Sequence, residues 1–318
     1  MRGATQLPVF LSNAIDEYLL VRQARGLAAN SLIAYRGDLN QFCTFAAGHD
    51  ITVVQLLGER LVNRWLDAGL LHLNWSRRTA ARKLEAVRGL AAWCKQERYL
   101  QHDPCADVRI RYRPRRVVAP EMEPLLQLVS GIGTDTPLDL RDRAALLLML
   151  DPALRAGEVA LLDIQQPGEP VPPYWVDVKH LRVYAHAKGG EQGEAEVVGM
   201  EEQTADAVRA WLKVRERLAA PGEHALFVNQ RGRRLSRQGL YLLVRDRGAA
   251  AGIPRLHPHK LRHRRIGDIT ERLGLQVASA QARHRNTSTT ANIYGAHAAE
   301  VQRDAVRRLA PLGEVRSC

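Results

Sequence analysis

The stretch that most constrains how this chain can fold is DPCADVRIRYRPRRVVAP, residues 103–120. It has prolines near both ends and a third, Pro114, in between, and its apolar residues follow no helical period. A stretch of this kind interrupts regular structure and is typical of a linker. We therefore predict two domains, residues 1–106 and 121–318, joined by a basic linker at residues 107–120. The 318 residues are enough for two hydrophobic cores.

The segment before the linker has the apolar periodicity of amphipathic α-helices. The first predicted helix ends at Gly26, and the second begins with Asn30 as its N-cap. The third is interrupted near Gly58, and the fourth begins at Ser76. This pattern predicts a small domain made entirely of helices.

The fourth predicted helix has one apolar and one basic face. Its apolar stripe runs through Leu84, Val87, Leu90 and Cys94, and its basic residues lie off that stripe. A basic face is either solvated or placed against phosphates. We take it, together with the arginines of the linker, as the candidate DNA-binding set: Arg77, Arg78, Arg82, Lys83, Arg109, Arg111, Arg113, Arg115 and Arg116.

The segment after the linker mixes helices with a few strands. A buried helix, a turn near Pro152 and a second helix are predicted within residues 138–164. Residues 173–188 and 194–200 alternate apolar and polar side chains, as in a small antiparallel sheet. Helices resume at residue 204. The predicted fold class is mainly α, with a helical N-terminal domain and a mostly α C-terminal domain that contains one small antiparallel sheet.

The charge of the chain indicates a polyanionic partner. The net charge is +12, and arginines cluster at residues 109–116, 229–238 and 259–265. Three separate basic clusters favour nucleic acid over an anionic membrane, because none of them has an amphipathic lipid-binding pattern. No apolar run reaches the length of a membrane span and no secretory signal is present, so we expect a cytoplasmic protein.

The four cysteines show no paired spacing. We expect reduced thiols at Cys43, Cys94, Cys105 and Cys318, and neither a disulfide framework nor a zinc site.

Two stretches of the second domain place single cations in unusual surroundings. Arg155 lies between two apolar runs and three residues before Glu158, so the two share a face of a helix. A partly buried arginine needs an acidic partner or an anionic ligand. Lys188 precedes two glycines between the predicted strands. It is either a solvated turn lysine or a proton donor that reaches into a duplex.

A third stretch, LHPHKLRHRR, combines imidazoles with guanidinium groups. His259 and His263 are four residues apart, a spacing found in zinc sites. The surrounding cations would repel a metal, and the nearest acidic residue is Asp268. Imidazoles and Arg262 on one helical face suit a phosphate better.

Several motifs together carry a resemblance to a known family. They are RDRAALLLML followed by ALRAGEVALL (141–162), PHKLRH (258–263), TTANIYGAH (289–297) and, in the first domain, RGLAANSLIAYRGDLNQF (25–42). In this order and spacing, the chain resembles the tyrosine site-specific recombinases and integrases, closest in pattern to their Xer-type and integron-type members. The resemblance spans nearly the whole chain and implies a two-domain clamp around DNA.

The resemblance implies a role for each matching residue. Tyr294 would be the nucleophile, Arg155 and Arg262 would clamp the scissile phosphate, and Lys188 would protonate the leaving 5′-oxygen. His259 and His284 would bind the phosphate and assist proton transfer. Supporting roles fall to Glu158, which would orient the site, and to His263, which would be structural. Because a 3′-phosphotyrosine retains the bond energy, the resemblance implies no cofactor, neither ATP nor metal.

The resemblance also implies partners. These are double-stranded DNA with inverted-repeat core sites and a homotetramer in the synapse, with a second recombinase or accessory protein as an option. Residues 297–312 predict an amphipathic tail helix, which docks on its own core or on a neighbouring protomer. Two alternatives stay open: a type IB topoisomerase, which uses the same chemistry, and a non-catalytic DNA-binding protein on the same fold.

The chain departs from the family pattern at four places. RHRRIGDI (262–269) replaces the usual small and threonine residues after the His-x-x-Arg-His motif. Arg283 stands where the family usually has glycine, before His284. Tyr294 follows His284 by ten residues, where nine is commoner. The residues before Arg155 read DPAL in place of the usual Thr-Gly. These departures indicate a divergent branch.

Overall fold

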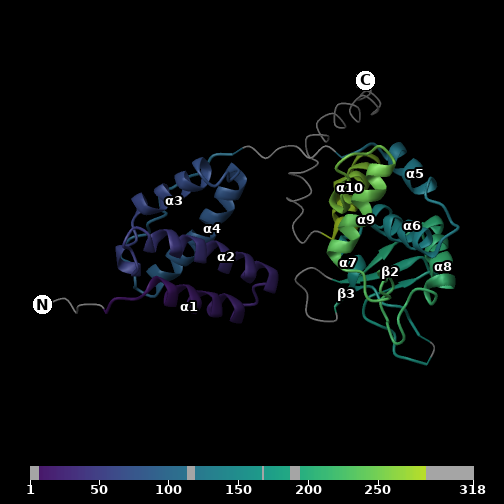
Figure 1. Ribbon diagram of the computed structural model, residues 1–318, viewed down its shortest axis with the longest axis horizontal. Helices are drawn as coiled ribbons and strands as arrows, with labels where there is room; N and C mark the ends of the chain where they lie inside the picture. Colours follow the sequence, from purple (N-terminus) through teal and green to yellow (C-terminus); the bar gives the residue numbers. More distant parts are fainter. Residues whose placement is uncertain (1–6, 113–118, 167, 187–193, 284–318) are drawn as a thin grey trace, which may run out of the picture. The chain divides into compact units, whose positions relative to one another are not determined.

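The computed structural model describes residues 7–112, 119–166, 168–186 and 194–283 (Figure 1). The chain divides into two compact units, Met1–Arg115 and Arg116–Cys318. Each has a hydrophobic core of its own. None of the described helices is long and apolar enough to cross a membrane.

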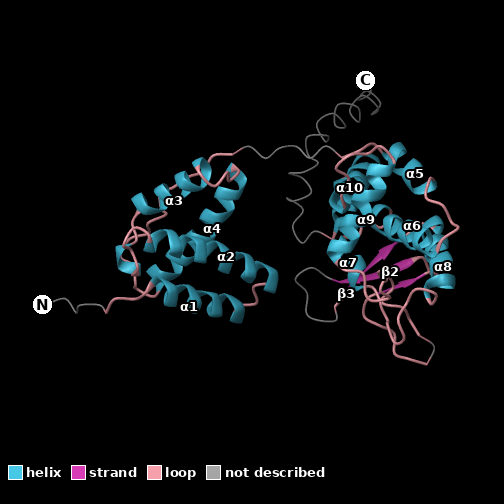
Figure 2. Ribbon diagram, viewed as in Figure 1, coloured by secondary structure: helices cyan, strands magenta, loops and turns pink. Residues whose placement is uncertain are grey.

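The described part of the N-terminal unit contains only helices (Figure 2). These are α1 (Leu11–Ala24), α2 (Ala29–Ala47), the 3-10 helix η1 (Val54–Leu56), α3 (Glu59–Leu71) and α4 (Arg77–Gln96). This confirms the helical pattern predicted for the first part of the chain.

The ends of these helices follow local chemistry. The chain turns after α1 at Gly26, whose φ of 79° suits a residue without a Cβ. Gly58 is the N-cap of α3, so the predicted interruption there is confirmed. Ser76 caps α4 as predicted, because its Oγ accepts a hydrogen bond of 3.0 Å from the Thr79 amide. Asn30 was wrongly predicted as a cap: α2 starts earlier, after Ala28, directly beyond the turn at Gly26.

The core of the N-terminal unit forms where α4 packs against α1, α2 and α3. The predicted apolar stripe of α4, Leu84, Val87, Leu90 and Cys94, is fully buried. Phe42 of α2 meets Trp65 of α3 edge to face, with ring centroids 5.1 Å apart.

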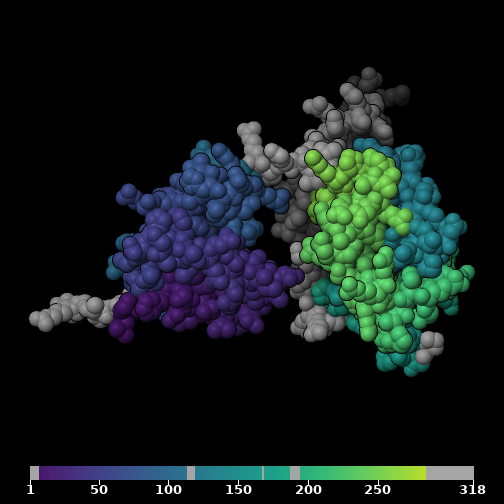
Figure 3. Space-filling model, in the orientation of Figure 1, coloured from purple at the N-terminus to yellow at the C-terminus, as the bar shows by residue number. Residues whose placement is uncertain are grey.

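The described part of the C-terminal unit combines helices with one sheet. Its helices are α5 (Met122–Ser130), α6 (Pro137–Leu150), α7 (Ala156–Leu161), α8 (Glu202–Arg215), α9 (Arg237–Ala250), α10 (Pro258–Leu273) and α11 (Leu275–Ala282). In the space-filling view, α9 and α10, drawn in green, form part of the visible surface of this unit (Figure 3).

The sheet has three antiparallel strands in the order β1 (Trp175–Asp177), β2 (Arg182–His186) and β3 (Ala195–Gly199). His186 pairs with Ala195, so residues 187–193 connect two paired strands. The small antiparallel sheet predicted from the alternating pattern is therefore confirmed.

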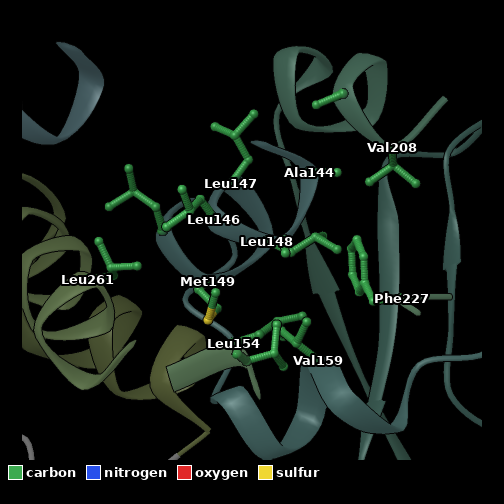
Figure 4. Close-up of a cluster of buried hydrophobic side chains, with 14 of the residues drawn as sticks. Ala144, Leu146, Leu147, Leu148, Met149, Leu154, Val159, Val208, Phe227 and Leu261 are labelled. Atoms are coloured by element: carbon green, nitrogen blue, oxygen red, sulfur yellow. The ribbon is translucent and has the colours of Figure 1, made fainter. Parts of the chain in front are cut away.

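Helix α6 runs through the middle of the C-terminal core. Its residues from Ala144 to Leu150 are all buried, which explains why its sequence is apolar on every side. Figure 4 shows Leu146, Leu148 and Met149 among side chains from other elements, including Leu261 of α10 and Phe227.

The carboxylate of Asp151, at the C-terminal end of α6, joins three helices. It accepts hydrogen bonds from the Glu201 amide (2.7 Å) and the Thr204 hydroxyl (2.7 Å) at the start of α8. It also accepts from Nη2 of Arg265 in α10 at 3.0 Å, while Nε of Arg265 donates to the Asp151 carbonyl. Burial nevertheless raises the pKa of Asp151, because these contacts only partly offset the loss of water.

Candidate functional site

Arg155 and Glu158 form a pair at the start of α7. Arg155 is the N-cap, with extended backbone, and Glu158 is the third residue of the helix. The Arg155 amide donates to Glu158 Oε2 at 2.7 Å, and its Nη1 donates to Oε1 at 2.6 Å. The sequence left an acidic partner or an anionic ligand open for Arg155, and the structure shows Glu158 as an acidic partner. The geometry differs from the expectation, since Arg155 precedes the helix and Glu158 turns back to reach it.

Arg262 reaches the same place from α10. It is 3% exposed, and its guanidinium donates from Nη1 to the Ala153 carbonyl and from Nη2 to the Ala282 carbonyl. Nη2 of Arg155 also donates to the Ala282 carbonyl, at 3.4 Å. The structure thus brings two predicted phosphate-clamping arginines, more than a hundred positions apart, to one main-chain oxygen.

A third guanidinium joins this cluster. Arg283 follows α11 in the left-handed conformation, with φ 49° and ψ 49°. Its Nη2 forms an ion pair with Oε2 of Glu158, and its side chain is 4% exposed. Sequence reasoning singled out Arg283 only as a departure from a family pattern, because no local signal reveals that its side chain meets Glu158.

The carboxylate of Glu158 is ionised at neutral pH. Its burial would raise the pKa, but the neighbouring guanidinium groups of Arg283 and Arg155, with the hydrogen bonds from Arg155, outweigh burial and lower it. Arg155, Arg262, Arg283 and Glu158 are hereafter called the arginine cluster. The cluster contains three guanidinium groups and one carboxylate, of which Arg155 and Arg283 pair with Glu158, so it has an excess of positive charge.

His259 and His263 lie on the first turns of α10. Their Nε2 atoms are 2.7 Å apart and their ring centroids 4.1 Å apart. Such a contact requires one imidazole to donate and the other to accept. His263 is buried and His259 is exposed, one turn of helix before Arg262. Among the residues that the structure describes, no three potential metal ligands gather in one place.

Beside this pair, His257 caps α10. Burial and the charge of Lys260 lower the pKa of His257. Its ring stacks on Tyr241 of α9, with centroids 6.4 Å apart.

Several predicted site residues lie outside the described residues. They are Lys188, which belongs to the segment between β2 and β3, His284, Tyr294, the linker arginines Arg113, Arg115 and Arg116, and the predicted tail helix at residues 297–312. The described chain reaches the arginine cluster at Arg283, directly before His284.

In the N-terminal unit, Lys83 was wrongly expected on the exposed basic face. It is 5% exposed, and its Nζ donates to Asp38 Oδ1 (2.8 Å) and Gln41 Oε1 (2.6 Å) of α2. The ammonium also lies 4.7 Å from the centre of the Trp75 ring. Asp38 is 45 positions away in sequence, so helical spacing alone could not reveal this partner.

The other predicted cations that the structure describes in this unit are exposed: Arg77, Arg78, Arg82, Arg109 and Arg111. Arg78 and Arg82 of α4 line a cavity of about 450 Å³ together with Tyr112, while Arg82 also pairs with Asp38. Arg77 donates to the carbonyl of Arg111 at 3.4 Å, which ties α4 to the described first part of the linker. Arg109 is exposed in that segment as well.

The sequence is similar to one family along most of its length. Residues 116–300 match the phage integrase family, and residues 15–98 match the N-terminal SAM-like domain of phage integrases. The tyrosine recombinase XerC of Stutzerimonas stutzeri is 32% identical over 255 residues, covering 80% of this chain and 81% of that protein. XerC of Pseudomonas aeruginosa PAO1 is 30% identical over 272 residues, covering 85% of each.

Solved structures share the fold. The integrase of the transposon Tn1549, in complex with a circular intermediate DNA, has a TM-score of 0.72 and 14% identity, covering 93% of this chain and 99% of that chain. The recombinase XerH, bound to a palindromic difH substrate in a post-cleavage complex, has a TM-score of 0.67 and 15% identity, covering 95% and 98%.

Proposed function

The chain belongs to the phage integrase family of tyrosine recombinases, enzymes that break and rejoin DNA strands, and we propose that it recombines two DNA sites through a covalent 3′-phosphotyrosine formed on Tyr294. The substrate would be double-stranded DNA with inverted-repeat core sites. Four protomers would act on two such sites. The outcome would be integration, excision or resolution of a mobile element or replicon.

One observation carries this proposal: Arg155 and Arg262 converge on the carbonyl oxygen of Ala282. A place where two guanidinium groups donate to one oxygen is equally suited to an oxygen of a phosphodiester. Such preorganised donors are worth most in the pentacoordinate transition state, where negative charge on the phosphate oxygens increases. Glu158 holds Arg155 from both its amide and its side chain, so the donor geometry is set in advance.

The proposed chemistry is a pair of transesterifications. The Tyr294 oxygen attacks phosphorus and forms the phosphotyrosine bond, while the bond to the 5′-oxygen breaks. Lys188 gives that oxygen a proton, and the free 5′-hydroxyl of the partner strand later reverses the step. A tyrosine has an ordinary pKa near 10, and guanidinium groups that bind the same phosphate would favour the phenolate of Tyr294. His259 and His284 would bind the phosphate and assist these proton transfers.

We further propose that domains 1–106 and 121–318 grip the duplex from two sides, with residues 107–120 as the connection. The exposed arginines Arg78 and Arg82 would contact phosphates from the N-terminal side, next to Tyr112. Binding through many such contacts releases counterions and depends steeply on salt.

The test is capture of a covalent protein–DNA adduct. Nicked duplexes prepared from the DNA that flanks the gene would be incubated with the full chain, and adducts separated by denaturing electrophoresis. The wild-type protein should form an adduct and Tyr294→Phe should bind the same duplex without forming one. Tyr241→Phe, a tyrosine on α9 that is 42% exposed, is the matched control and should form it normally.

Three outcomes would contradict the proposal in different ways. An adduct with Tyr294→Phe would exclude the assigned nucleophile. Binding without any adduct on these duplexes would favour a non-catalytic DNA-binding protein. Relaxation of one supercoiled plasmid, with no joining of two captured sites, would favour a topoisomerase.

A further inference from the structure

Arg283 has more donor capacity than its partners use. Its Nη2 pairs with Glu158, and its Nε lies 3.8 Å from Oε2 of Glu196, beyond hydrogen-bond distance. Within the described structure its Nε and Nη1 are both buried without a hydrogen-bond partner. A buried donor without an acceptor is costly, so this arrangement calls for a missing acceptor.

The charge around Arg283 indicates what kind of acceptor is missing. Glu158 is shared between Arg155 and Arg283, while Arg262 donates to the carbonyl oxygens of Ala153 and Ala282. Glu196 on β3, whose Oε2 lies 3.8 Å from Nε of Arg283, has a side chain that is 40% exposed. A cluster with more guanidinium groups than carboxylates, and with most of its side chains shielded from water, favours an anion.

The backbone of Arg283 adds an independent observation. A residue with a Cβ is uncommon at φ 49°, a conformation that glycine adopts without strain. Strain of this kind persists where the surrounding structure needs the side chain, and it concentrates at functional sites. A role limited to ending α11 would be served better by glycine, so the reason for an arginine lies in its guanidinium group.

We propose that Arg283 is a third phosphate-binding guanidinium, which donates through Nε and Nη1 to a non-bridging oxygen of the scissile phosphodiester. This inference rests on the proposed function and deepens it. Arg155 and Arg262 approach the phosphate from the side of the Ala282 carbonyl. Arg283 follows Ala282 directly and approaches from the side of Glu158.

The competing explanation is that Arg283 acts only through Glu158, as a structural partner of Arg155. The two explanations differ in their dependence on the charge of the phosphate. A direct contact loses value when a non-bridging oxygen is replaced by a methyl group, because the phosphate then becomes neutral. If Arg283 acts only through Glu158, its contribution to the rate is the same whether or not the scissile phosphate is charged.

The experiment uses a nicked duplex on which the wild-type protein forms the covalent adduct, in two versions. They are identical except at the scissile position, where one has a phosphodiester and the other a methylphosphonate. Adduct formation is timed for the wild-type protein, Arg283→Ala and Arg283→Gly. Glycine suits the positive φ and keeps the fold testable if the alanine variant does not fold. The matched control is Arg234→Ala, whose guanidinium holds the other end of α7 through the Ala160 carbonyl and Asp163.

The substitutions at Arg283 should slow adduct formation on the phosphodiester by about tenfold or more. On the methylphosphonate the same variants should lie within about threefold of the wild-type rate, because the contact they remove has less charge to stabilise. Arg234→Ala should give the same ratio to wild type on both duplexes. Equal defects of the Arg283 variants on both duplexes, or no defect on either, would overturn the inference. Failure of the wild-type protein on both would instead contradict the proposed function.

Discussion

Both units of this protein gather cations around one buried carboxylate, and the two clusters differ in what remains unpaired. In the N-terminal unit, Asp38 of α2 binds Arg82 and Lys83 of α4. In the C-terminal unit, Glu158 binds Arg155 and Arg283. Each carboxylate is therefore shared by two cations, and each joins segments distant in sequence.

The partners of the cations separate the two cases. The ammonium of Lys83 has Asp38, Gln41 and the face of Trp75, which together account for its donors. The guanidinium of Arg283 has donors left over within the described structure, and two further guanidinium groups share the Ala282 carbonyl beside it. The comparison teaches that a buried cation with complete partners indicates architecture. One with unused donors beside other cations indicates a ligand.

The largest expected effect is on chemistry at the arginine cluster. Arg155→Ala should reduce the rate of adduct formation by about a hundredfold or more, because it removes a preorganised donor to the transition state. Timed adduct formation on the captured duplex measures this. Arg272→Ala, also a lost guanidinium but 75% exposed on α10, is the control and should react at the wild-type rate. Equal rates for Arg155→Ala and wild type would remove Arg155 from the site.

The next effect should be on stability, in the N-terminal unit. Lys83→Ala should lower the free energy of unfolding by about 3 kcal/mol, because a buried ion pair loses one partner and Asp38 keeps only the half-exposed Arg82. Urea unfolding followed by tryptophan fluorescence measures it. Lys95→Ala, exposed on the same helix, should change little. A similar loss in both variants would show that Lys83 is not special.

A smaller effect is expected on DNA binding. Arg78→Ala should weaken binding a few-fold and lower the slope of log affinity against log salt by about 1, the signature of one lost phosphate contact. Lys83→Met keeps the buried stem and removes the charge, so its slope should stay at the wild-type value. Fluorescence anisotropy over a salt series distinguishes them. If Lys83→Met lowered the slope of log affinity against log salt, Lys83 would have to contact DNA phosphates after all.

The smallest effect is on the pH dependence of stability, where two buried carboxylates of the C-terminal unit should differ in sign. The pKa of Glu158 is lowered from 4.5, so the unfolded state binds more protons and stability falls as pH decreases below that value. The pKa of Asp151 is raised from 3.8, so the folded state binds more protons and stability falls as pH increases from that value through the raised pKa.

Substitutions isolate these two contributions. Glu158→Gln should remove the loss at decreasing pH, and Asp151→Asn should remove the loss at increasing pH. Urea unfolding at a series of acidic pH values measures both. If both substitutions changed the slope of unfolding free energy against pH in the same direction relative to the wild-type protein, the assignment of these two contributions would be contradicted.

Local sequence chemistry predicted much of this fold, for identifiable reasons. The cap at Ser76 and the stripe from Leu84 to Cys94 depend on residues within a few positions of one another. The same holds for the pair of Arg155 with Glu158. Contacts between residues far apart in the sequence could not be predicted, because helical or strand periodicity relates only residues within a few positions of one another. Lys83 with Asp38 and Arg283 with Glu158 are two such cases, separated by 45 and 125 positions.

The junction at Asp151 has a consequence for how accurately the site can be assembled. Asp151 precedes Arg155 by four positions, and its partner Arg265 lies one helical turn after Arg262. A single carboxylate is thus a common reference point from which both guanidinium groups are positioned. Displacements of about 1 Å in such a site cost on the order of a hundredfold in rate. Asp151 therefore helps to fix the distance between the two arginines, because it ties the end of α6, four residues before Arg155, to the helix that carries Arg262.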